Sequence, residues 1–220
     1  YPKKLYHKLL KDDKIFTEEI NNPLNDAKKC RDLFYCELEA FNSFPNSLKS
    51  IFGNLLSKQN EFAGFFKYID YSSTWNLKKD ILNFFKGKIC ENANLSELID
   101  EYPVELGYAL SLINTSDKED NISPWVLINY PKIEYVIKML RSTPCKNGCS
   151  YCNTVFDLKA KLKQFFNYDE FRMFNGEKLQ ENAVRGAAYG ESLLAIFPTG
   201  GGKSLTFQLP ALIDGEASRS

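Results

Sequence analysis

A glycine-rich segment close to the C-terminal end contains the residue types that bind nucleotide phosphates. The apolar run 193–197, expected to be a short buried strand, is followed by Pro-Thr, three glycines, a Lys-Ser pair and a run that can be helical. Strand, glycine loop, Lys-Ser and helix is the order that a phosphate-binding loop requires. Glycines let backbone N–H groups approach phosphate oxygens because no Cβ stands in the way. The residues expected to contact the nucleotide here are Thr199, Gly200, Gly201, Gly202, Lys203 and Ser204.

Lys203 and Ser204 are the two residues of this loop to which we assign catalytic roles. Lys203 would reach the β- and γ-phosphates, and the Ser204 hydroxyl would ligate Mg²⁺. A helix that begins after Ser204 adds unpaired N–H groups and the positive end of a helix dipole. A strict form of the motif would have glycine at the position of Phe197. The expected cofactors are ATP and Mg²⁺.

Three cysteines within eight residues form the second group with metal-binding chemistry. Cys145, Cys149 and Cys152 can wrap one metal ion, and Zn²⁺ requires four ligands in a tetrahedron. Cys90 is the expected fourth ligand. It is preferred to Cys30, Cys36 and His7, because the first two of these lie in a helix that already has a core role.

The spacing of the three cysteines supports a metal but does not choose one. Zn²⁺ is the expected ion, a structural iron–sulfur cluster is the alternative, and three unmetallated thiols remain a further alternative. The spacing also resembles the cluster loop of radical S-adenosylmethionine enzymes. Those enzymes need a barrel after the loop, whereas here a phosphate loop follows within fifty residues.

Composition is that of an ordinary globular protein with no obvious membrane segment. The 220 residues are 44% hydrophobic and 25% charged, and the formal net charge is zero. No run of eighteen apolar residues occurs, so no membrane span is expected. Six cysteines beside an ATP-type loop favour a reducing cytoplasmic location, where metal sites are commoner than disulfides. Because the first residue is not Met, we expect a piece of a longer chain.

The balanced net charge hides two segments of opposite sign. Residues 91–121 contain eight acidic residues and one basic residue, whereas residues 131–165 contain seven basic and two acidic residues. The basic segment can be read as a DNA-docking face or as an ordinary solvated face.

The region before the cysteines is expected to be all-α. Apolar residues recur there at spacings of three and four, as in Leu48, Ile51, Phe52 and Leu55, which is typical of helices packed on one face. Residues 1–20 are expected to form one or two surface helices, and 114–123 a loop. The proline-bounded segment 124–131 fits either a strand or the start of a helix. The aromatic residues in these stripes are expected to form core rather than a base-stacking surface.

Three residues between the cysteines and the glycine loop have the chemistry of an adenine site. Tyr168 and Arg172 can sandwich a flat base. The Gln180 amide can pair with adenine N6 and N7.

Taken together, these motifs resemble the opening of a RecQ-family DNA helicase over residues 158–213. The shared pattern is Phe-Asn-Tyr-x-x-Phe-Arg, a Gln, and then Phe-Pro-Thr-Gly-Gly-Gly-Lys-Ser-Leu-x-x-Gln-Leu-Pro-Ala-Leu, whose glycine loop is similar to the first motif of superfamily 2 helicases. The resemblance implies that Tyr168, Arg172 and Gln180 contact adenine. One departure is that seven residues separate Arg172 from Gln180, where the family usually has two. Either an insertion bulges out, or the two residues are not both placed as in the family.

The resemblance implies a fold class and a function. We expect a mainly α accessory domain (1–142), a cysteine-rich metal-binding loop (143–153), and the truncated beginning of an α/β, RecA-like helicase lobe (154–220). The expected function is that of the N-terminal part of an ATP-dependent DNA helicase acting on single-stranded or forked DNA. Its remaining catalytic residues are expected beyond Ser220, so that the fragment alone is inactive. A non-unwinding ATPase or translocase, and a DNA- or protein-docking accessory module, are the alternatives.

Overall fold

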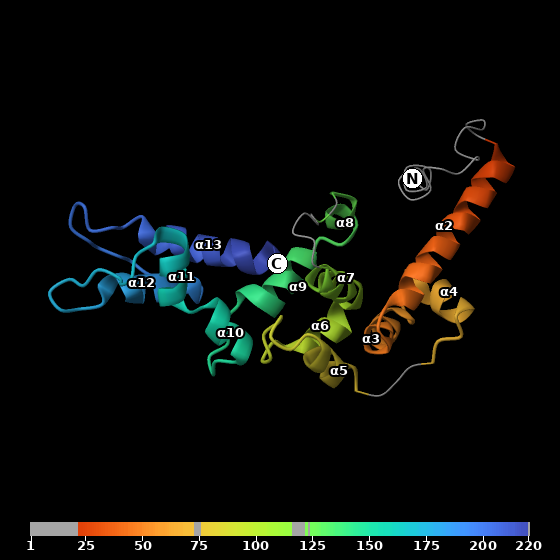
Figure 1. The fold of residues 1–220 in the computed structure, drawn as a ribbon, viewed down its shortest axis with the longest axis horizontal. Coiled ribbons are helices and arrows are strands. Elements are labelled where there is room, and N and C mark those ends of the chain that lie inside the picture. The colour runs from red at the N-terminus through yellow and green to blue at the C-terminus, as the bar shows by residue number, and fades with distance from the viewer. Residues whose placement is uncertain (1–21, 73–75, 116–121, 123, 220) are drawn as a thin grey trace. The chain divides into compact units, whose positions relative to one another are not determined.

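The computed structural model describes residues 22–72, 76–115, 122 and 124–219, and over these residues it is helical (Figure 1). The chain divides into two compact units, residues 1–50 and residues 51–220. Across the described part, β-pairing is restricted to an isolated antiparallel bridge between Phe174 and Glu177. The surface helices predicted for residues 1–20 lie outside the described residues.

The first unit contains a long helix that begins at a proline. Helix α2 spans Pro23–Ser43, and the Asn22 side chain caps it by accepting hydrogen bonds from the backbone N–H groups of Leu24 (3.0 Å) and Asn25 (3.4 Å). Proline in the first turn costs no helix hydrogen bond. Helix α3 (Asn46–Leu56) begins directly after Pro45 and runs across the boundary between the two units.

The second unit continues with short helices that bury the predicted apolar stripes. Leu106, Leu110 and Ile113 are buried, as the spacing predicts, and the ambiguous segment after Pro124 is a helix. The helices are α4 (Asn60–Tyr68), α5 (Leu77–Phe84), α6 (Leu95–Glu101), α7 (Pro103–Asn114), α8 (Pro124–Asn129) and α9 (Ile133–Ile137).

The last part of the second unit carries both sets of candidate functional residues. A π-helical turn, η2 (Lys138–Ser142), continues α9 and is followed by α10 (Ser150–Val155), α11 (Leu158–Phe166), α12 (Leu179–Ala188) and α13 (Leu205–Arg219). Helix α13 packs against α11, α12 and η2 (Figure 1). The core beneath the candidate nucleotide residues consists of Leu158, Leu162, Phe171, Val184, Leu205, Leu209 and Ile213.

The buried strand predicted at residues 193–197 is wrong for this structure. The segment has no strand partner, and the side chains of Leu194 and Ile196 are 87% and 80% exposed, whereas Phe197 is buried. A strand needs a neighbouring chain segment to satisfy its N–H and C=O groups, and the described residues offer none beside it. The apolar composition of residues 193–197 predicted burial. Burial of a strand, however, requires a neighbouring segment to pair with, and the sequence of one segment does not show whether such a neighbour exists.

Two further sequence predictions concern the domain limits and membrane segments. The predicted domain limits at 142 and 153 both fall inside the second unit, and the RecA-like α/β lobe stays a prediction. Among the described helices, none is both long and apolar enough to cross a membrane.

We predict that Leu209→Ala destabilises the second unit by about 2–5 kcal/mol, because Leu209 is fully buried among α11, α12 and α13 and its truncation leaves a cavity. Leu212→Ala, at an exposed site on the same helix, is the matched control and should change stability by less than about 1 kcal/mol. Urea unfolding of both variants measures the difference, and equal losses would contradict this packing.

Candidate nucleotide pocket and candidate metal centre

A pocket of about 490 Å³ lies where the 166–172 loop meets α12 and the start of α13. Its size is within the range of sites for small ligands. The three predicted adenine residues line it together with two residues of the glycine loop segment, so the fold brings the two predicted groups to one place. The lining is Phe166, Asn167, Tyr168, Asp169, Glu170, Arg172, Gln180, Gly202, Ser204, Leu205 and Gln208.

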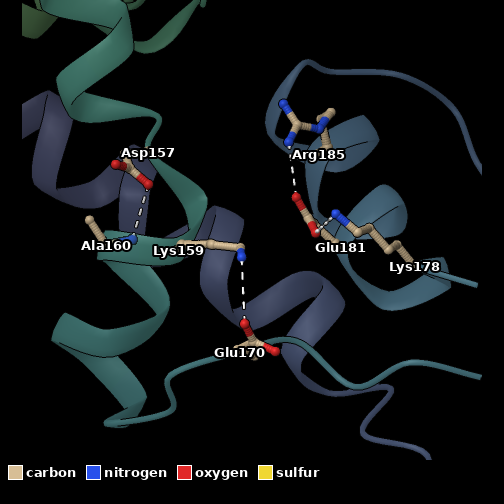
Figure 2. Close-up of polar contacts among 7 residues, drawn as sticks. All are labelled: Asp157, Lys159, Ala160, Glu170, Lys178, Glu181 and Arg185. Atoms are coloured by element: carbon tan, nitrogen blue, oxygen red, sulfur yellow. Dashed lines mark hydrogen bonds and ion pairs between the residues drawn. The ribbon is translucent and has the colours of Figure 1, made fainter.

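The loop that carries Tyr168 is tied to α11 by two ion pairs. Lys163 Nζ lies 2.8 Å from Asp169 Oδ1, and Lys159 Nζ lies 3.8 Å from Glu170 Oε1, the latter drawn in Figure 2. Tyr168 is 58% exposed and stacks on Phe166, with ring centroids 6.4 Å apart and planes 13° apart. The tyrosine ring is therefore a supported, accessible flat surface at the edge of the pocket.

The segment between Arg172 and Gln180 forms a small hairpin, which answers the question of the extra residues. Phe174 and Glu177 exchange two backbone hydrogen bonds of 2.9 Å. Asn175 and Gly176, the residues between them, both have positive φ, as an Asn-Gly turn of this kind requires. The chain leaves the pocket at Arg172 and returns at Gln180, so the extra residues project outward.

Gln180 joins the two sides of the pocket through its buried side chain, which is 2% exposed. Its Oε1 accepts a hydrogen bond of 2.9 Å from the Arg172 backbone N–H, and its Nε2 donates one of 3.1 Å to the Gly202 carbonyl. The Arg172 guanidinium donates to the Gly200 carbonyl at 2.7 Å. In this structure the groups predicted to read adenine hold the glycine loop, and their contact with a base stays a prediction.

Helix α12 presents Gln180 from its first turn, which is stabilised by charge. Glu181, the next residue, lies 3.2 Å from the Arg185 guanidinium and 3.8 Å from the Lys178 ammonium (Figure 2). A carboxylate in the first turn also suits the positive end of the helix dipole. The position of the carboxamide is thus fixed by helix geometry as well as by its own hydrogen bonds.

The glycines of the loop are required by its backbone. Gly200 and Gly202 have φ of 76° and 72°, a region that side chains disfavour. A Cβ on Gly201 would lie 2.9 Å from the Pro198 carbonyl oxygen, and a Cβ on Gly202 would lie 2.6 Å from Gln180 Nε2. The tight loop and its contact with Gln180 both depend on the absence of side chains here.

The remaining predicted phosphate residues lie around this loop in different positions. Gly202 and Ser204 line the pocket, whereas Thr199, Gly200 and Lys203 are exposed outside its lining and Gly201 is buried. Sequence reasoning missed Phe166, Asn167, Asp169, Glu170, Leu205 and Gln208 as lining residues. Gln208 could have been found, since it follows Ser204 by one helical turn and so shares its face.

The four predicted metal ligands come together in the structure. The Sγ atoms of Cys90, Cys145, Cys149 and Cys152 all lie within 4.8 Å of one another, and Cys145 alone is only partly buried. Cys149 caps the start of α10, where its Sγ accepts a hydrogen bond of 3.4 Å from the Cys152 backbone N–H. This cluster could hold a metal ion and is compatible with Zn²⁺, which favours four thiolates in a closed tetrahedral site.

Backbone and side-chain donors surround the sulfur atoms. Burial raises the pKa of the Cys149 thiol, but the N–H groups of Cys152 and Glu91 stabilise its thiolate and bring the pKa below its usual value. Burial raises the pKa of Cys90 to about 11 and also raises the pKa of Cys152. The Asn92 side chain donates to Cys145 Sγ at 3.3 Å. Without an ion, the buried cluster therefore retains protons on some of its thiols.

Helix α11, in the basic segment, does not present free cations. Lys159 and Lys163 pair with the Tyr168 loop, and Lys161 Nζ lies 2.7 Å from Glu216 Oε2. Arg141 is buried and donates to the Tyr151 hydroxyl at 3.2 Å. The pairs of Lys159 and Lys163 are solvent-exposed, so the reading of residues 131–165 as a DNA-docking face stays a prediction.

Comparisons with known proteins find two similar DNA helicases, each over a short region. The chain is 47% identical over 58 residues to the ATP-dependent DNA helicase hus2/rqh1 of Schizosaccharomyces pombe, which is 26% of this chain and 4% of that protein. It is 41% identical over 56 residues to the ATP-dependent DNA helicase RecQ of a Synechocystis strain, which is 26% of this chain and 11% of that protein. No family model and no solved structure matches the chain.

We predict that metal binding at the cysteine cluster strengthens as pH rises from 6 to 8. Cys90 and Cys152 have raised pKa values and are protonated throughout this range, so an ion must displace their protons. Displacement of at least two protons changes affinity by at least about a hundredfold for each pH unit. Competition with a chromophoric chelator at pH 6, 7 and 8, corrected for the chelator's own protonation, measures this. A pH-independent affinity would contradict the protonated state of the free cluster.

Proposed function

We propose that this chain is part of a RecQ-like ATP-dependent DNA helicase and that the 490 Å³ pocket is its ATP site. The similarity to two DNA helicases supports the family over a short region. The observation that carries the ATP site is the meeting of the tyrosine–arginine–glutamine set with the glycine loop around one cavity. One group predicted for a base and one predicted for phosphates contribute residues to the same cavity.

The residues present fit ATP in distinct roles. Tyr168 offers an exposed ring for stacking on the adenine base, and Arg172 lies on the same pocket wall. Gln180 retains one N–H and one lone pair beyond its two bonds, which a base edge can use. The glycine loop would provide backbone N–H groups for phosphate oxygens. At the start of α13, the N–H groups of Leu205, Thr206 and Phe207 donate to the carbonyls of the loop in this structure. Lys203 and Ser204 come directly after the glycines. Lys203 would neutralise phosphate charge, and the Ser204 hydroxyl would ligate Mg²⁺.

Any movement of the glycine loop on nucleotide binding would change the hydrogen bonds that its carbonyls now accept. Arg172 and Gln180 hold the carbonyls of Gly200 and Gly202. A base that draws on either side chain would change these bonds, so the base and phosphate subsites communicate through two residues. When bound, ATP supplies the hydrolysable phosphoanhydride whose turnover drives a helicase.

Unwinding of DNA is proposed for the whole protein only. Among the described pocket residues the carboxylates are Asp169 and Glu170, and both pair with lysines beside the base subsite. The acidic residue that would complete a Mg²⁺ site beside Ser204 is expected elsewhere in the whole protein, so residues 1–220 are proposed to bind ATP without turning it over. In a complete α/β motor lobe, the exposed apolar residues Leu194 and Ile196 would be covered by a partner strand.

We further propose that the four cysteines bind one Zn²⁺ ion. With Zn–S bonds of about 2.3 Å, a tetrahedron places its sulfur atoms about 3.8 Å apart. The Sγ atoms of Cys149 and Cys90 are 3.9 Å apart, and all four lie within 4.8 Å of one another. An iron–sulfur cluster distributes its thiolates over different irons and needs wider separations. This compact spacing favours a single ion.

We predict that Tyr168→Ala weakens ATP binding by about tenfold, because the base loses its stacking surface. Tyr189→Ala is the matched control, since Tyr189 is exposed at the end of α12 and lies outside the pocket lining. Titration of the chain with ATP and Mg²⁺ by calorimetry measures both. Equal affinity in the two variants would exclude the proposed base subsite.

We predict one zinc ion per chain and no absorbance near 400 nm. Cys149→Ser should lose the metal, because it removes a buried ligand at the centre of the cluster. Cys30→Ser should retain it, since Cys30 is an exposed thiol outside the cluster. Metal analysis of the purified variants decides the matter. A coloured protein containing iron would replace zinc with the cluster alternative, and a folded, metal-free protein would exclude both.

A further inference from the structure

The candidate metal centre is packed directly against the core beneath the nucleotide pocket. Cys90, Cys149 and Cys152 form a buried cluster against which Val155 and Phe156 pack. The same two residues also pack against the core that contains Leu158, Leu205 and Leu209. Helix α10, which contains Cys152 and is capped by Cys149, therefore connects the cysteine cluster to the core that includes Leu205 and Leu209 of α13.

A second connection runs through the π-helical turn η2. The Cys90 backbone N–H donates to the Leu140 carbonyl at 2.8 Å. The Tyr151 hydroxyl, on α10 between two cysteines, donates to the Arg141 carbonyl at 3.1 Å and accepts from the Arg141 guanidinium at 3.2 Å. Both segments that contribute cysteines are thus bonded to η2.

The turn η2 in turn supports the far end of the helix that begins at the pocket. Helix α13 packs on η2, and the hydroxyls of Ser142 and Ser218 are 3.2 Å apart. The ion pair between Lys161 and Glu216 ties the same end to α11. At its other end, α13 starts next to Gly202 and Ser204, which line the pocket. Helix α13, which contains Pro210 in its interior, therefore spans from the neighbours of the cysteines to the glycine loop.

An ion at the cysteines would supply order that these short elements lack alone. Helix α10 has six residues and η2 five, and helices of this length are not stable without tertiary support. Metal binding to a site that the unfolded chain does not contain contributes directly to folding. Buried thiols without an ion offer only weak hydrogen bonds in its place.

We propose that the four-cysteine centre, by binding one metal ion, positions α13 and thereby sets the affinity of the pocket for nucleotide. This inference rests on the proposed ATP site, and it adds to that site a metal-dependent support from residues 90–152. By thermodynamic linkage the coupling is reciprocal, so nucleotide must tighten metal binding by the same factor as metal tightens nucleotide binding.

The test compares ATP affinity in the zinc-loaded chain of residues 1–220, in the same chain after chelation, and in Cys149→Ser. We expect about tenfold weaker ATP binding in the latter two, within the usual range of coupling between sites. Cys30→Ser, with the same chemical change at an exposed thiol outside the cluster, should bind ATP like the wild type. Far-UV circular dichroism verifies that each sample is folded.

A second measurement decides the outcome even if metal-free chains unfold. The zinc affinity of the loaded wild type is determined by competition with a chelator, with and without ATP and Mg²⁺, and is compared with that of Tyr168→Ala. Direct binding of zinc by ATP is identical in both proteins. At an ATP concentration about three times the dissociation constant of the loaded wild type, a tightening of about threefold in the wild type and little change in the variant supports coupling. Equal zinc affinity with and without ATP overturns it. If the loaded wild type binds no ATP, the proposed ATP site itself is wrong.

Discussion

The candidate pocket depends on one buried carboxamide. Gln180 is almost fully enclosed, and a buried amide must satisfy its donor and acceptor groups or lose several kcal/mol. It does so by bonding Arg172 on one side and Gly202 on the other. This arrangement requires the hairpin, which loops the extra residues out between Arg172 and Gln180. It also requires glycine at position 202, where a Cβ would collide with Gln180 Nε2. Base subsite and phosphate subsite are therefore parts of one hydrogen-bonded unit.

The cysteine cluster imposes a similar constraint on the helices before it. Cys90 comes from the segment after α5, and the other three cysteines flank or begin α10, so their meeting fixes two distant parts of the chain. The N–H donors already directed at the sulfur atoms stabilise thiolate charge, which is the state that a metal ion requires. The cysteine cluster and the core beneath the candidate nucleotide pocket share Val155 and Phe156, so the two candidate sites are packed together in the same unit.

The similarity to RecQ-type helicases covers about a quarter of the chain, and the structure gives the other residues a physical context. The described helices before the cysteines bury the aliphatic stripes together with Phe52, Phe66 and Phe85, whereas several other aromatic rings are exposed, among them Tyr35, Tyr68, Trp125 and Tyr135. The lysines of α11, which looked like a docking face for DNA, serve to hold the Tyr168 loop and the end of α13. These lysines form ion pairs within the second unit, beside the candidate nucleotide site.

The sequence by itself indicated most of the helices, the glycine loop and the three closely spaced cysteines. Local patterns suffice for these: periodic apolar residues indicate helices, three glycines before a Lys-Ser pair indicate a tight loop, and thiols at close spacing indicate a candidate metal site. Only the tertiary structure decided that Cys90 joins the other three cysteines, that the hairpin returns Gln180 to Arg172, and that Gln208 faces the pocket. It also decided that residues 193–197 are exposed, against prediction. Each of these depends on contacts between segments far apart in sequence, and a local pattern contains no information about which partner a segment will meet.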